Sequence, residues 1–175
     1  MTIQEIYEQV LLDVPKLIMR NFIKRYNEAV DVLSTRYDTA NMKKTDYIDA
    51  TDSEQVWYDL PSDCKGVNKV TTEDNRELRS YICEGDKIKF GFTGNFAIEY
   101  IGMPTKITKL EKTPMHTGIH ESFHMAIVKY ILAYEQSPEM FSFNMKLYEE
   151  LASKADERLR SIKRKNMRIP VRPFR

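Results

Sequence analysis

The fold class of this chain is decided near its middle by residues 87–100, which read Lys87-Ile88-Lys89-Phe90-Gly91-Phe92-Thr93-Gly94-Asn95-Phe96-Ala97-Ile98-Glu99-Tyr100. Apolar side chains occupy every second position before and after Thr93-Gly94-Asn95, and such alternation is typical of strands that bury one face. Glycine and asparagine favour a tight turn between the two runs. The stretch therefore predicts a hairpin over residues 90–100, with one aromatic face and one wetter face.

Shorter runs before the hairpin predict further strands at residues 56–60, 67–71 and 78–83. With the hairpin they make a predicted small antiparallel sheet that spans about residues 54–102. The aromatic face of this sheet needs cover, either from a second layer of the same chain or from a neighbouring subunit. Residues 39–53 lose the alternation and predict a linker or long loop.

Helical periodicity precedes and follows the predicted sheet. Apolar residues at steps of three and four predict helices over residues 3–12 and 19–37, with a restart at Pro15, and again over residues 119–134 and 143–162. The third of these helices is apolar on most sides, which is typical of the central helix of a bundle. The sequence thus predicts an α+β fold, in which residues 1–165 form one domain: a bundle of two N-terminal and two C-terminal helices with the sheet inserted.

The charge of the chain is concentrated at its C-terminal end. From Lys154 onward nine basic residues stand against two acidic ones, a net +7, which leaves 18 basic and 24 acidic residues, a net −6, on the rest. Such an asymmetry indicates a binding partner. Phosphate contacts by the basic end, giving weak nucleic-acid binding, are one interpretation, and a solvated helix end is another.

Residues 166–175 favour docking on a protein. Two prolines and alternating apolar and basic side chains predict an extended segment. A tail that stays in solvent gains nothing from the apolar side chains of Ile169, Val171 and Phe174, whereas a segment that binds in a groove buries such side chains. We expect this arm to be disordered alone and to fold on binding. The predicted docking residues are Arg164, Lys165, Met167, Arg168, Ile169, Pro170, Val171, Arg172, Pro173, Phe174 and Arg175.

Residues 120–124, His-Glu-Ser-Phe-His, match the zinc motif H-E-x-x-H. On a helix the two histidines could share a zinc ion while the glutamate activates its water. A catalytic zinc needs a third protein ligand, but His116 falls in the preceding loop and Glu149 on a face expected to meet water. We therefore expect His124 to pack inside the bundle and His120 to lie near its rim, with no metal, no cofactor and no enzymatic activity; a zinc metallopeptidase is the alternative.

Composition excludes several other classes of protein. The 175 residues are 42% hydrophobic and 30% charged, which is globular composition, and no apolar run approaches the length of a bilayer span. The acidic start lacks the basic region of a signal peptide, so we expect no export. Cys64 and Cys83 are too few for a disulfide framework, which predicts buried free thiols and a reducing site of synthesis.

The features above follow one another in a distinctive order. After two N-terminal helices come Trp57-Tyr58-Asp59-Leu60-Pro61-Ser62-Asp63, then strands that end in residues 96–101, then the helical stretch Phe123-His124-Met125-Ala126-Ile127-Val128-Lys129-Tyr130. This order resembles that of the head–tail adaptor (connector) proteins of tailed bacteriophages, over most of the chain and best over residues 57–134. A histidine after an aromatic residue fits the bundle helix of such proteins, which gives His124 a structural explanation.

The resemblance implies a ring of twelve identical subunits that binds beneath the portal of a DNA-filled capsid. It implies that the C-terminal segment reaches into the portal protein, that the lower surface meets tail or further adaptor proteins, and that DNA passes through without specific binding. It also implies a virion location at the head–tail interface after synthesis in the cytoplasm of a host bacterium. The acidic body suits a DNA channel, since a basic wall would bind phosphates.

Overall fold

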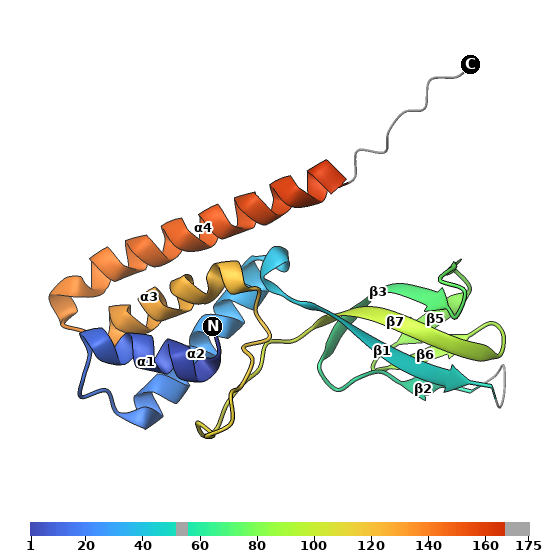
Figure 1. Ribbon diagram of the computed structural model, residues 1–175, viewed down its shortest axis with the longest axis horizontal. Coiled ribbons are helices and arrows are strands. Elements are labelled where there is room, and N and C mark those ends of the chain that lie inside the picture. The colour runs from blue at the N-terminus through green and yellow to red at the C-terminus, as the bar shows by residue number, and fades with distance from the viewer. Residues whose placement is uncertain (52–55, 167–175) are drawn as a thin grey trace, which may run out of the picture. The chain divides into compact units, whose positions relative to one another are not determined.

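A computed structural model describes residues 1–51 and 56–166 of the chain (Figure 1). The chain divides into two compact units, a helical unit made of Met1–Ala40 and Thr105–Arg175 and a β unit made of Asn41–Pro104. The predicted α+β class is confirmed, because a β-rich segment is inserted between the second and third α-helices of the described chain. Residues 167–175 of the predicted arm lie outside the described residues.

The helical unit is built from α1 (Ile3–Asp13), α2 (Met19–Arg36), α3 (His124–Glu135) and α4 (Phe141–Asn166), with short 3-10 turns η1 (Asp38–Ala40), η2 (Glu121–Phe123) and η3 (Pro138–Met140). A capping box begins α1, in which the Thr2 hydroxyl accepts from the Glu5 amide and the Glu5 carboxylate accepts from the Thr2 amide. The second helix begins later than the predicted restart at Pro15, because the Leu17 amide donates to the Val14 carbonyl at 3.1 Å and closes a turn.

Helix α3 is the centre of this unit, as predicted. It contacts α1, α2 and α4, and its side chains Ile127 and Ile131 are completely buried. They share one core with Phe22 and Leu33 from α2 and with Tyr148 from α4. A helix surrounded in this way has little room for a polar face, which explains its nearly continuous apolar sequence.

The predicted apolar stripe of the last helix is wrong at both ends. Phe143 is 54% exposed and Ile162 is 46% exposed, whereas the buried positions of α4 include Asn144, Tyr148 and Ala152. Positions four apart advance about 40° around a helix, so a run of four-residue steps that ends on the buried face begins away from it, at Phe143. The amide of Asn144 is satisfied there because it donates to the Gln136 side-chain oxygen at 2.8 Å.

The β unit contains two antiparallel sheets. One has the strand order β1-β7-β3-β4 and the other the order β2-β6-β5. The strands are β1 (Lys43–Ala50), β2 (Tyr58–Asp59), β3 (Cys64–Thr72), β4 (Glu77–Leu78), β5 (Tyr81–Glu84), β6 (Lys87–Phe90) and β7 (Gly94–Gly102). The strand predicted at 67–71 is thus confirmed as part of β3. The strand predicted at 78–83 is divided between β4 and β5, which belong to different sheets, and the strand predicted at 56–60 is reduced to the two residues of β2.

The linker predicted at residues 39–53 is wrong, because it contains β1. This strand pairs with β7 over its full length, from Lys43 opposite Ile101 to Ala50 opposite Gly94. It is an edge strand that buries only Ile48 and Ala50. Its polar composition is typical of edge strands, which use charged side chains to resist further pairing.

The hairpin predicted over residues 90–100 is also wrong in its pairing. Strand β6 pairs with β2 and β5, whereas β7 pairs with β1 and β3, so the two strands belong to different sheets. The alternation itself is confirmed, since Ile88, Phe90, Phe96 and Ile98 are all buried. The aromatic face was expected to be covered either by a second layer of the same chain or by a neighbouring subunit. In the structure a second layer of the same chain covers it, because residues of both sheets share one core.

Candidate docking site

The H-E-x-x-H motif does not lie on one α-helix. His120 precedes η2 as its N-cap, and its Nδ1 accepts a hydrogen bond from the Ser122 amide at 3.2 Å. Only His124 belongs to α3. Two histidines one helical turn apart could share a zinc ion, but a non-helical cap and a helical residue do not present their rings in that way.

The ring of His124 is buried and engaged on both nitrogens. Its Nε2 lies 2.9 Å from the Thr117 hydroxyl and 3.0 Å from the Ile119 carbonyl oxygen, and its Nδ1 lies 2.9 Å from the Met1 amino nitrogen. Burial lowers the pKa of His124 below its ordinary value, because the charged form loses its solvation. This confirms the expectation that His124 packs in the bundle, with the half-buried His120 at the rim.

The remaining metal-ligand candidates are dispersed. Glu149 is 59% exposed and forms an ion pair with Arg36 at 3.7 Å, so it faces solvent on α4 as expected. Within residues 1–51 and 56–166 no group of three or more His, Cys, Asp or Glu side chains is placed to hold a metal ion. The geometry of the described residues therefore favours a structural role for the motif.

The predicted docking residues begin at the C-terminal end of α4. Arg164 is exposed there and Lys165 continues the helix, while the other predicted docking residues lie outside the described part of the chain. About two turns earlier, Asp156 fastens the helix to the body, because its carboxylate accepts from the Thr39 hydroxyl and from the Arg160 guanidinium, each at 2.7 Å. Beyond this point α4 presents its cations to solvent.

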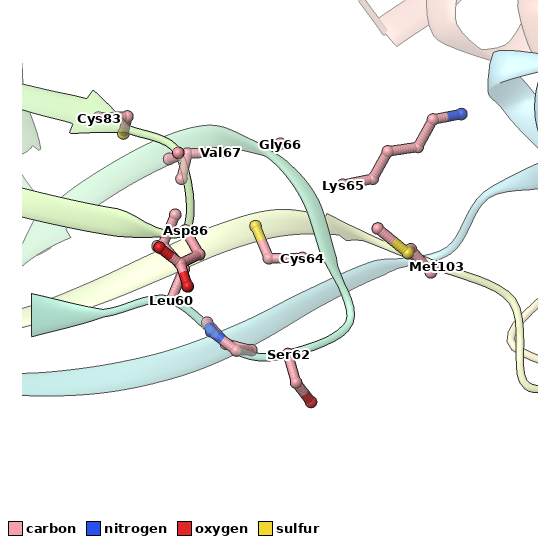
Figure 2. Close-up of a pocket in the computed structure, with 11 residues that line it drawn as sticks. Leu60, Ser62, Cys64, Lys65, Gly66, Val67, Cys83, Asp86 and Met103 are labelled. Carbon is pink, nitrogen blue, oxygen red and sulfur yellow. The ribbon is translucent and has the colours of Figure 1, made fainter.

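The described residues also form a pocket that sequence reasoning missed. It has a volume of about 510 Å³ and lies in the β unit between the start of β3, the turn from β5 to β6, and Met103 (Figure 2). Leu60 and Val67 line it, and so do both cysteines, Cys64 and Cys83. Because its walls come from segments far apart in the sequence, no local pattern could have indicated it.

The two cysteines differ in their surroundings. Cys64 is half-buried but Cys83 is exposed, so the prediction of buried thiols is wrong for Cys83. Burial raises the pKa of both thiols, and for Cys83 the charge of Cys64 raises it further. A nucleophilic cysteine needs the opposite shift, toward the thiolate. Neither thiol is shifted toward the thiolate, and the pocket wall is partly apolar, at Leu60 and Val67, and partly polar, at Lys65 and Asp86.

Next to the pocket, Asp63 joins three segments of the β unit. Its carboxylate forms an ion pair with Lys44 on β1 and accepts a hydrogen bond from the Tyr100 hydroxyl on β7 at 3.1 Å. Its carbonyl accepts from the Met103 amide at 2.7 Å. These bonds hold residues 58–63 against β1 and β7. Asp63, the last residue of this segment, therefore has a structural role.

The pKa values of this cluster follow from its contacts. Burial disfavours the charged form of Asp63, but the hydrogen bonds from Lys44 and Tyr100 outweigh burial and hold the pKa of Asp63 below its ordinary value. Burial, followed by the hydrogen bond to Asp63, raises the pKa of Tyr100 to about 12. Both shifts keep the carboxylate charged and the phenol protonated, which maintains the bond between them.

Comparison with known proteins adds no family to this description. Neither the models of protein families nor the curated proteins contain a match to the sequence. In the part of the chain that the structure describes, every helix is too short or too polar to cross a lipid bilayer.

Proposed function

We propose that this chain is a non-enzymatic structural protein of a tailed-bacteriophage particle. Identical copies form a ring that joins the portal of the DNA-filled capsid to the tail and continues the DNA channel. The end of α4 supports this proposal most directly. There a long helix carries exposed cations away from the core and leads into the proline- and arginine-rich residues 167–175.

Helix α4 is long enough for its C-terminal turns to extend beyond the core of the helical unit. The helix has 26 residues, whereas α3, against which it packs, has 12. Ile162 stands on the same side of α4 as the buried Ala155, because seven residues are close to two helical turns. It is nevertheless 46% exposed, compared with 6% for Ala155. The final turns of α4 therefore leave a partly apolar, strongly basic face open to a partner.

The histidine geometry favours this proposal over the metallopeptidase. A zinc ligand must offer a free lone pair, but both nitrogens of His124 are already in contact with protein groups. Weak binding of nucleic acid by the basic end remains compatible with a ring around DNA, because phosphate contacts carry no sequence preference.

Electron microscopy tests the proposal. The full chain is co-expressed with the portal and tail proteins encoded beside it, in parallel with a variant that lacks residues 167–175. We expect rings of the full chain on the portal, and for the variant a folded protein, by circular dichroism, that no longer docks. Portals that carry no density for the full chain would contradict the connector function, and undiminished docking of the variant would remove the role of residues 167–175.

A further inference from the structure

We draw no further inference here: the strongest candidate, the outer edge of strand β1 in the four-stranded sheet, has its lysines Lys43 and Lys44 already paired with Glu99 and Asp63 of the same unit, and nothing in the described part of the chain shows what covers that edge.

Discussion

The ring of Phe90 stacks on the ring of Phe96, with centroids 4.1 Å apart and an interplanar angle of 25°, although the two residues belong to different sheets. Five residues separate Phe90 on β6 from Phe96 on β7, and the chain between them passes from one sheet to the other instead of closing a hairpin. The contact therefore joins the two layers of the β unit at its core.

Phe96→Ala should destabilise the β unit strongly. The side chain is 1% exposed and contacts the rings of Phe90 and Phe92, so its removal leaves a cavity and costs about 3–5 kcal/mol. The free energy of unfolding in urea measures the loss. Tyr47→Ala is the matched control on β1, where the side chain is 78% exposed and the expected change is within about 0.5 kcal/mol. Equal losses for the two variants would contradict the assigned core.

The stacking contact also shows how far local pattern predicts the β unit. Alternation indicates which side chains a strand buries, and the burial of Phe90 and Phe96 agrees with it. It carries no information about the neighbouring strand, because sheet partners come from distant segments. Strand β1 escaped detection for a related reason, since an edge strand with two buried residues has almost no alternation to read.

The helices were better predicted because their periodicity is local. The bounds of α1, the C-terminal end of α2 and the central place of α3 followed from apolar steps of three and four residues, whereas the predicted restart at Pro15 did not. The cluster around Asp63 and the adjacent pocket could not be anticipated, because Lys44, Asp63 and Tyr100 come from three separate segments. Only the docking segment, whose residues are contiguous, can be proposed from the sequence itself.

His124 should make the stability of the helical unit depend on pH below neutrality. Its pKa in the folded protein is below the ordinary 6.5, so the unfolded chain binds a proton first as the pH falls. Its contribution is fully present above pH 6.5 and is lost as the pH falls toward the lower folded pKa. The Met1 amine, which lies against Nδ1, disfavours the imidazolium in the same direction.

The measurement is the melting temperature between about pH 5 and pH 7.5, where His is the side chain that titrates. His124→Gln should lower the melting temperature throughout but reduce its decline toward acid. His116→Gln, at an exposed position of the same unit, should keep the original decline. Identical pH profiles for the original chain and His124→Gln would show that another group titrates.

Asp63→Asn should loosen the contact between β1 and β7 and the segment before β3. The amide cannot pair with the Lys44 ammonium, and because Asp63 is 35% exposed and screened by solvent, the expected loss is about 1 kcal/mol. The lowered pKa of Asp63 means that this stability is present above its ordinary pKa of 3.8 and disappears as the pH falls below it. The two proteins should therefore converge in stability in acid.

The same variant should act on Tyr100. Its pKa of about 12 arises first from burial and then from Asp63, so removal of the carboxylate should lower the pKa but leave it above the ordinary 10.0. Titration of the Tyr100 ring carbons by nuclear magnetic resonance measures this. Asp59→Asn is the control, because that carboxylate pairs with Lys87 and is 82% exposed. An unchanged Tyr100 pKa in Asp63→Asn would mean that the hydrogen bond is absent in solution.

The purified protein should contain no stoichiometric zinc, and the two histidines should differ in what they contribute. His120→Ala removes one cap hydrogen bond at the rim and should cost about 1 kcal/mol. His124→Ala empties a buried position and removes the contacts of Nε2 with the Thr117 hydroxyl and the Ile119 carbonyl, so it should cost about 2–4 kcal/mol. Elemental analysis and urea unfolding measure the two effects. One zinc per chain, lost equally in both variants, would instead indicate a metal site shared by the two histidines. Ligands of one ion are required together, whereas two separate structural contacts contribute to stability according to their own burial.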